Sequence, residues 1–229
     1  MNIVQVPRRA NFNKTISITL AIYLLGAVVY GAFEAQIIDA ASVQDQVVIN
    51  LTVTSEITIT SPSDVTMSPS IPGLTGGAAT GTATWTVITN DSSGYSVTHI
   101  ASSTTLDGDT QGDAFAAYTE GTAGVPDFTW SVAAGAKEFG YTVNSYTDSS
   151  SIAALFKDNG SACNTGSSVT YNRCYIHAST TAETIYNRST ETTSSGTSFT
   201  IDYKAESGSS AFITEDTYTA TTTVTATTN

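Results

Sequence analysis

The sequence has little charge, and most of that charge is of one sign. Charged residues make up 12% of the 229 residues, and 8 Lys and Arg stand against 20 Asp and Glu, a formal net charge of −12. A surface with so few cations does not neutralise phosphate groups, which argues against nucleic acids and anionic lipids as partners. Polarity comes instead from Ser and Thr hydroxyls, and Thr is favoured in strands because its branched Cβ suits a pleated sheet.

The sequence also lacks a recognisable catalytic arrangement. It has two histidines, and no Ser stands in the Gly-x-Ser-x-Gly turn that exposes the nucleophile of many hydrolases. His99 lies at an alternating strand position, where packing in a core is the usual role. Asp107 and Asp109 stand in a Gly-rich turn, which favours solvent exposure over paired acid and base catalysis. We therefore expect no catalytic residues and no enzymatic activity.

Cysteine is scarce, with Cys163 and Cys174 as the two cysteines of the chain. In an exported protein such a pair favours a local disulfide, worth about 2–3 kcal/mol through the loop entropy of the unfolded state. A metal site that includes His177 is the alternative. Two thiols and one imidazole lack the fourth ligand of a structural zinc site, so the sequence favours the Cys163–Cys174 disulfide.

One long apolar run is present, and it lies at the N-terminus. Residues 15–33 are mostly apolar, follow three basic residues and precede small residues at positions 40–42. This order is typical of a secretory signal peptide, and cleavage after Ser42 would release a chain that begins at Val43. The alternative is a retained anchor, because about 20 apolar residues cross a bilayer. We expect a signal peptide or anchor at residues 1–42, a secreted, cell-surface protein, and membrane contact only through an uncleaved segment.

The most regular pattern beyond this segment is the alternation of apolar and polar residues over positions 47–60. It predicts one long strand with a core-facing side and a polar side. Its fourteen residues at about 3.3 Å each span ~46 Å, longer than a typical sandwich strand. A strand broken near Ser55, with both halves packed in one monomer, is the alternative. The apolar side of this candidate assembly strand carries Val47, Ile49, Leu51, Val53, Ile57 and Ile59.

Further alternating segments are separated by turns rich in Gly, Ser and Asn. Residues 79–87 and 95–99 flank the polar turn Asn90–Gly94, which predicts a β-hairpin with Trp85 and Tyr95 in the core. A short apolar patch at residues 114–118 suggests one helical turn. Other strand candidates lie at residues 128–132, 139–143, 169–176, 199–205 and 218–226.

These segments together predict an all-β protein without an amphipathic helix in the mature chain. We expect an antiparallel β-sandwich of immunoglobulin-like or jelly-roll-like type, following the N-terminal signal helix. It would contain eight or nine strands in a single domain over residues 43–229.

The segment from Asp107 to Asp113 follows the start of a calcium-binding loop. Oxygen-bearing side chains stand at alternate positions, and Gly112 allows a sharp turn. An amide replaces the third acid, and Tyr118 occupies the position of the usual bidentate Glu, so an ordinary solvated acidic turn is the favoured alternative. Ca²⁺ is the single cofactor that the sequence suggests, with ligands expected from Asp107, Asp109, Gln111 and Asp113.

Trp85 and Trp130 are candidates for a carbohydrate-binding platform, because aromatic faces stack on sugar rings. Both also lie at alternating strand positions, which favours packing in the core. A monomeric secreted adhesin or carbohydrate-binding module, with cell-surface glycans as its partner, is therefore an alternative function.

Three parts of the chain resemble secreted β-proteins of candidate-phyla-radiation (Patescibacteria) bacteria. They are TVTSEITITSPSDV at residues 52–65, WTVITN at 85–90 with GYSV at 94–97, and TYTA at 217–220 with VTAT at 224–227. The resemblance implies an exported protein at the cell surface, and it brings no activity or functional residue with it. With the candidate assembly strand, it leads us to expect a structural protein that forms a homopolymer by β-strand addition, as a subunit of a filament, pilus or surface layer.

Overall fold

A computed structural model describes the protein at residues 20–27, 42–145 and 147–229. The chain divides into two units, Met1–Leu51 and Thr52–Asn229. In the first unit, residues 20–27 are helical and residues 42–51 have no regular secondary structure. The rest of the expected signal peptide or anchor, including its basic residues and Ala40, lies outside the described residues. Within the described ranges, no helix is long and apolar enough to span a bilayer.

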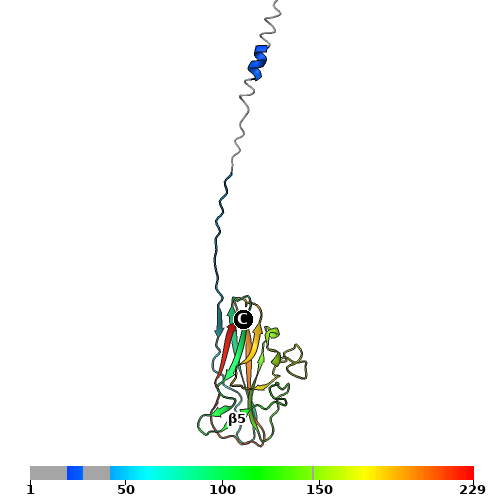
Figure 1. The fold of residues 1–229 in the computed structure, drawn as a ribbon. Helices are drawn as coiled ribbons and strands as arrows, with labels where there is room; N and C mark the ends of the chain where they lie inside the picture. Colours follow the sequence, from blue (N-terminus) through cyan, green and yellow to red (C-terminus); the bar gives the residue numbers. More distant parts are fainter. Residues whose placement is uncertain (1–19, 28–41, 146) are drawn as a thin grey trace, which may run out of the picture. The chain divides into compact units, whose positions relative to one another are not determined.

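The second unit is all-β, as the alternating pattern predicts (Figure 1). Its described residues form eleven strands, more than the eight or nine expected, and these make an eight-stranded and a three-stranded sheet. Every pair of neighbouring strands is antiparallel except β5 with β6. The large sheet has the order β1 (Ile57–Thr60), β2 (Gly77–Thr89), β9 (Thr197–Ser207), β6 (Lys137–Asn144), β5 (Ala114–Ala117), β4 (Leu106–Gly108) and β10 (Tyr218–Thr219), with β7 (Ile176–His177) also paired to β6. The small sheet has the order β11 (Thr222–Thr228), β3 (Tyr95–Ala101) and β8 (Glu183–Arg188). Two 3-10 turns, η1 (Ser149–Ser151) and η2 (Ala154–Phe156), lie in the chain between β6 and β7.

The core lies between the two sheets. β9 is an inner strand of the large sheet, because β2 pairs with one of its edges and β6 with the other. The alternating face predicted for this strand is buried. Phe199 of β9 stacks on Trp85 of β2 at 5.8 Å between ring centroids, and on Tyr186 of β8 at 5.4 Å. These ring contacts tie the small sheet to the large one.

β2 and β3 follow one another across the Asn90–Gly94 turn, but they do not pair, so the predicted β-hairpin is wrong. β2 pairs with β1 and β9, while β3 pairs with β8 and β11. The turn therefore carries the chain from one sheet to the other. Gly94 has a φ of +82°, and a Cβ there would collide with the carbonyl oxygen of Arg188, so this crossing needs glycine. Trp85 and Tyr95 are buried, as predicted, but from opposite sheets.

Three other local predictions were also wrong. Residues 128–132 form no strand, and of residues 169–176 only the last belongs to a strand, β7. The expected helical turn at residues 114–118 is instead β5, because β6 and β4 supply partners on both of its sides. Short apolar runs fit a helix or a strand equally well, and the neighbouring strand decides between them.

Candidate functional site

The single long strand predicted over residues 47–60 is wrong. Only Ile57–Thr60 form a strand, β1, and residues 47–56 have no regular secondary structure. The reason lies in β2, whose last residue, Thr89, pairs with Ile57. Residues before Ile57 therefore extend past the end of their partner strand, and a strand needs a partner for its backbone N–H and C=O groups.

The predicted apolar side is divided between two environments. Ile57 and Ile59 are half-buried and pack against the core. The other four side chains are between 75% and 90% exposed, and these are Val47, Ile49, Leu51 and Val53. Val48, on the predicted polar side, is exposed to a similar degree. We call the four exposed apolar residues at alternate positions the exposed apolar row.

Asn90 holds the residues that join this row to β1. Its Oδ1 accepts a hydrogen bond from the Glu56 N–H at 2.7 Å, and its Nδ2 donates to the Thr54 carbonyl at 3.0 Å. The Thr89 hydroxyl donates to the Glu56 carbonyl at 2.7 Å. One amide side chain thus replaces a strand partner for residues 54–56 and keeps them in line with β1. The sequence pattern places Asn90 in a turn and gives no sign of this contact, because residues 54–56 are more than thirty positions away.

The Asp107–Asp113 segment comprises the last two residues of β4 and the turn that leads to β5. The Asp107 and Asp109 carboxylates accept hydrogen bonds from the hydroxyls of Thr105 at 2.6 Å and Thr219 at 3.0 Å. Asp113 forms an ion pair with Lys137, and this hydrogen bond lowers the pKa of Asp113 to about 2.

Gln111 and its neighbour Thr110 bind an acid from a distant part of the chain, which the local sequence pattern does not reveal. The Asp216 carboxylate accepts hydrogen bonds from the N–H groups of Thr110 and Gln111 at 2.8 and 2.9 Å. These bonds lower the pKa of Asp216. No group of three metal-ligating His, Cys, Asp or Glu side chains occurs in the part of the chain that the structure describes. Calcium binding stays a prediction of the sequence.

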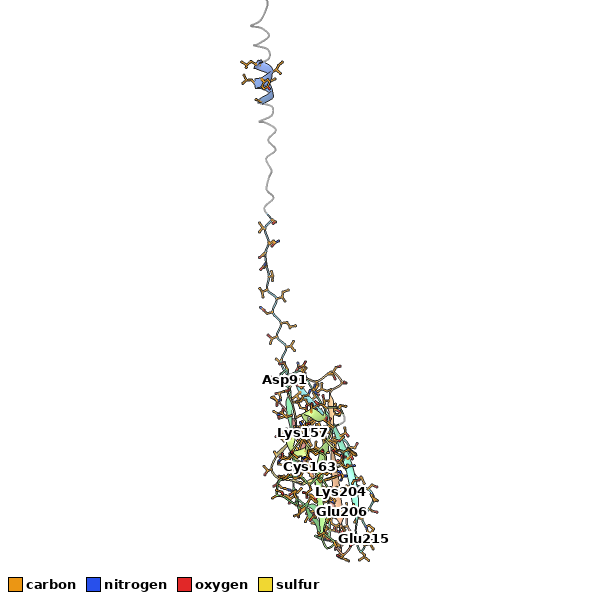
Figure 2. All side chains as sticks on the ribbon, turned by 90° about the vertical axis from the view of Figure 1, so that its right-hand side faces the viewer. Asp91, Lys157, Cys163, Lys204, Glu206 and Glu215 are labelled. Carbon is orange, nitrogen blue, oxygen red and sulfur yellow. A yellow bond between two sulfur atoms is a disulfide. The ribbon has the colours of Figure 1, made fainter. Side chains whose placement is uncertain are left out.

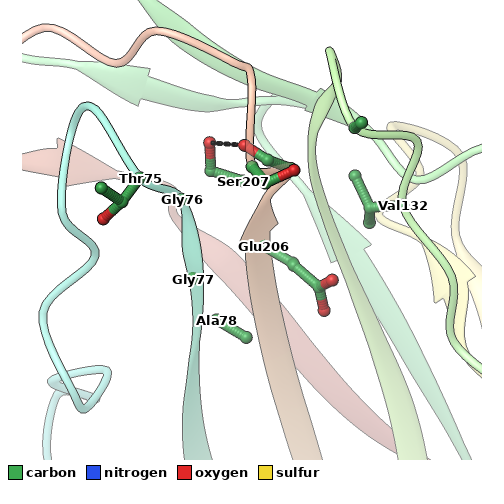
Figure 3. Close-up of a pocket in the computed structure, with 10 residues that line it drawn as sticks. Thr75, Gly76, Gly77, Ala78, Val132, Glu206 and Ser207 are labelled. Carbon is green, nitrogen blue, oxygen red and sulfur yellow. Dashed lines mark hydrogen bonds between the residues drawn. The ribbon is translucent and has the colours of Figure 1, made fainter.

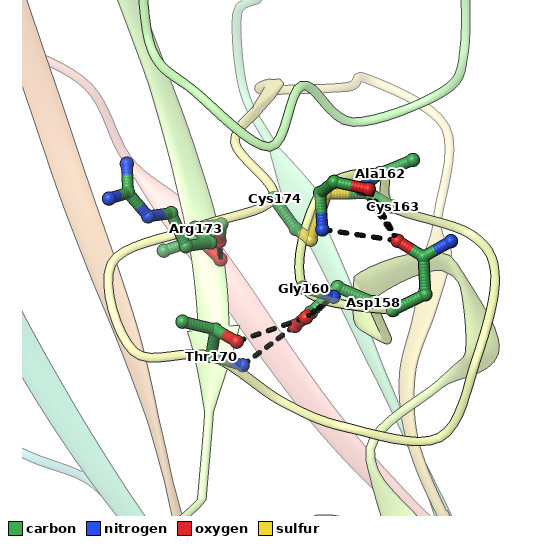
Figure 4. The surroundings of a disulfide bond; sticks show 10 residues. Asp158, Gly160, Ala162, Cys163, Thr170, Arg173 and Cys174 are labelled. Carbon is green, nitrogen blue, oxygen red and sulfur yellow. Dashed lines mark hydrogen bonds between the residues drawn. A yellow bond between two sulfur atoms is a disulfide. The ribbon is translucent and has the colours of Figure 1, made fainter.

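Cys163 and Cys174 form the predicted disulfide, with 5.6 Å between their Cα atoms (Figure 4). Because both sulfurs are in this bond, the alternative metal site with His177 is wrong, and the His177 imidazole instead pairs with Glu120 at 2.6 Å. Asp158 orders the same loop, since its carboxylate is buried and accepts the Gly160 and Thr170 N–H groups at 2.8 and 2.7 Å.

Removal of the disulfide by Cys163→Ser with Cys174→Ser is expected to lower the free energy of unfolding by about 3 kcal/mol, from the size of the loop that it closes. Urea unfolding monitored by circular dichroism measures this change. As a control, reducing agent should destabilise the parent protein by a similar amount and leave the double variant unchanged. Equal stability of parent and variant would show that the loop is ordered by Asp158 alone.

Neither tryptophan offers an open face for a sugar. Trp85 is buried, as core packing predicts. Trp130 is half-buried, stacks on Tyr118 at 4.1 Å, meets the Tyr175 ring edge-on at 5.1 Å, and has the Lys204 ammonium 5.0 Å from its centroid. The Trp130 ring is thus already in contact with the side chains of Tyr118, Tyr175 and Lys204.

An open pocket of about 440 Å³ lies where the ends of β2 and β9 meet (Figure 3). Its wall is formed largely by backbone and small side chains, including Gly76, Ala78 and Ser207. Of the residues described around it, only Glu206 has a titratable side chain. That carboxylate lies 3.3 Å from the ammonium of Lys204, its neighbour on the same face of β9 (Figure 2). The pocket therefore offers no pair of titratable groups for acid and base chemistry.

Comparisons with protein-family models, with curated proteins and with solved structures find no match for this chain. The resemblance to Patescibacterial surface proteins accordingly stays a prediction. The exposed apolar row and the contacts that hold its base are the features of the described residues that bear most directly on function.

Proposed function

We propose that this protein is an extracellular structural subunit that assembles by β-strand addition, with residues 43–53 as the donor segment. The observation that carries the proposal is the exposed apolar row, four large side chains at alternate positions of a segment without a strand partner. Soluble proteins rarely leave such a row in water, and contiguous exposed apolar surface marks interaction sites. Alternation at a period of two fits a strand that buries one side in a partner.

Hydrophobic burial alone is too weak for a stable assembly. Full burial of four Val, Leu or Ile side chains is worth about 6–12 kcal/mol. This is similar to the ~4–15 kcal/mol cost of bringing two molecules together. The backbone hydrogen bonds of an added strand are therefore required as well. The sequence of residues 43–53 suits this role, since it contains no Gly or Pro and is rich in β-branched residues.

Deletion of residues 43–53 from a chain that begins at Val43 is expected to convert large assemblies into monomers. Light scattering measures the size of each. The deletion leaves Thr54, Glu56 and β1 in place, so the melting temperature of the sandwich should stay the same. Deletion through Thr60 would remove β1 from the large sheet and confuse loss of assembly with loss of fold.

A matched pair of substitutions tests which side of the donor segment is buried in the assembly. Leu51→Asp places a charge in the exposed apolar row and should abolish assembly, whereas Thr52→Asp places the same charge on the opposite side and should leave assembly in place. Equal assembly of the two variants would argue against strand addition. A parent chain that stays monomeric would contradict the proposal and favour the alternative, a monomeric adhesin or carbohydrate-binding module.

A further inference from the structure

The small sheet has two edges, and one of them is already covered. On the outer side of β8, the Ala153 N–H donates to the Ile185 carbonyl at 3.0 Å, and Ile152 forms a bridge with Tyr186. On the other edge, β11 pairs with β3, and within the described ranges no second strand pairs with β11. β1 lies beside β11 but belongs to the large sheet (Figure 1). Within the described ranges, the outward backbone groups of β11 therefore form no ladder with another strand, and we call this side of β11 its open edge.

The register shows which backbone groups of β11 point to this open side. At its two ends, Ser102 N–H donates to the Thr221 carbonyl at 2.8 Å and Asn229 N–H donates to the Gly94 carbonyl at 3.1 Å. Hydrogen-bonded pairs alternate in an antiparallel ladder, so the odd-numbered residues of β11 bond to β3. The N–H and C=O groups that point outward belong to Thr222, Val224, Ala226 and Thr228.

The side chains of these same four residues face inward and are only half-buried. Val224 and Ala226 pack against the core, together with Ile57 and Ile59 of β1. The side chains between them, those of Thr223, Thr225 and Thr227, are exposed. The edge thus combines free backbone groups with an incompletely covered apolar layer.

We infer that the open edge of β11 in one copy receives residues 47–53 of a second copy, as a fourth strand of the small sheet. This inference rests on the proposed function and adds the acceptor to it. Both segments have seven residues. The exposed apolar row would extend the half-buried layer of β11, while Val48, Asn50 and Thr52 would flank its exposed threonines. Neither segment contains a charged residue, which matters because each copy carries a net charge of −12.

The contacts of Asn90 indicate that the strand added to β11 comes from a second copy and not from residues 47–53 of the same molecule. They hold residues 54–56 in line with β1, which itself lies beside β11. For residues 47–53 to pair with β11 of the same molecule, the chain would have to reverse next to Thr54. The sequence offers no Gly or Pro between Val43 and Thr60 for such a reversal.

Val224→Pro tests the acceptor, because it removes an outward N–H and leaves the bonds of β11 to β3 intact. Pro is tolerated on an edge strand at a position whose N–H faces solvent. We expect Val224→Pro to be a folded monomer by light scattering and circular dichroism. Val224→Ala, which keeps the N–H, should still assemble. Assembly of Val224→Pro to the size of the parent would overturn the inference.

A mixture of two variants gives a sharper test, because one variant lacks the donor segment and the other lacks the acceptor edge. The chain without residues 43–53 accepts but does not donate, and Val224→Pro donates but does not accept. Each alone should be a monomer, and a mixture should contain 1:1 dimers with no larger species. A mixture that stays monomeric would overturn the inference.

A cross-link makes the same test without a change in the backbone. Asn50 and Thr225 are the central residues of the two segments, so they lie opposite each other whether the added strand runs parallel or antiparallel. Copies with Asn50→Cys mixed with copies with Thr225→Cys should form an intermolecular disulfide, and the native cysteines do not interfere because both are already paired. Thr58→Cys on β1 is the control, and a preference for it would overturn the inference.

The two proposals fail in different ways. If the parent chain is a monomer, or if deletion of residues 43–53 leaves assembly unchanged, strand donation itself is wrong. If that deletion abolishes assembly while Val224→Pro assembles and residues 50 and 225 do not cross-link, donation stands and β11 is not its acceptor.

Discussion

Phe199→Ala is expected to destabilise the sandwich by about 4 kcal/mol, the typical cost of removing a fully buried phenylalanine. Phe199 has no exposed surface and lies on β9, at the centre of the large sheet. Its ring stacks between Trp85 and Tyr186, so its removal leaves a cavity where the two sheets meet. Urea unfolding monitored by tryptophan fluorescence measures the loss, which should also appear as a lower melting temperature.

Phe212→Ala is the matched control for this prediction. Phe212 is 66% exposed, so the same change of side chain removes little buried surface and should leave stability nearly unchanged. A loss for Phe199→Ala no larger than that for Phe212→Ala would show that the contact between the sheets is not centred on Phe199.

Acidification from pH 6.5 to about 4 is expected to lower the free energy of unfolding by about 3 kcal/mol because of His99. This side chain is fully buried, and its ring lies 4.3 Å from that of Tyr141. Neither ring nitrogen has a hydrogen-bond partner among the described residues. Burial lowers the pKa of His99 from 6.5 to about 4. Between these values the unfolded chain binds a proton that the folded protein does not, so stability falls as the pH falls.

Four other groups with shifted pKa values affect the pH dependence of stability in different ways. Burial raises the pKa of Tyr141 and raises that of Tyr203 to about 12, so both stay neutral in this range. The lowered pKa of Asp113 causes a further loss of stability only below its unfolded value of 3.8. Burial raises the pKa of Asp202, which has the opposite sign and partly offsets the loss near pH 4.

His99→Phe separates the imidazole from these carboxyl groups, because it keeps a ring in the core and removes the titration. Urea midpoints measured across the same pH range should then vary much less in the variant than in the parent. Equal pH dependence of the two proteins would contradict the assignment to His99.

The sequence by itself determined the features that depend on local chemistry. Alternation at a period of two predicted an all-β protein, the buried face of β9 and the packing of His99, because side-chain direction in a strand follows directly from the backbone. The scarcity of other thiols and the export-type composition predicted the Cys163–Cys174 disulfide, which is confirmed.

The tertiary structure alone decided which strands pair. The segments on either side of Asn90 alternate in the same way whether they form a hairpin or, as here, lie in opposite sheets. Likewise, residues 47–56 carry a strand pattern, but β2 ends at Thr89 and leaves them without a partner. Asp216 reaches the Asp107–Asp113 turn from more than a hundred residues away. Pairing and capping depend on contacts between distant parts of the chain, and alternation specifies the side that a strand buries but not the strand beside it.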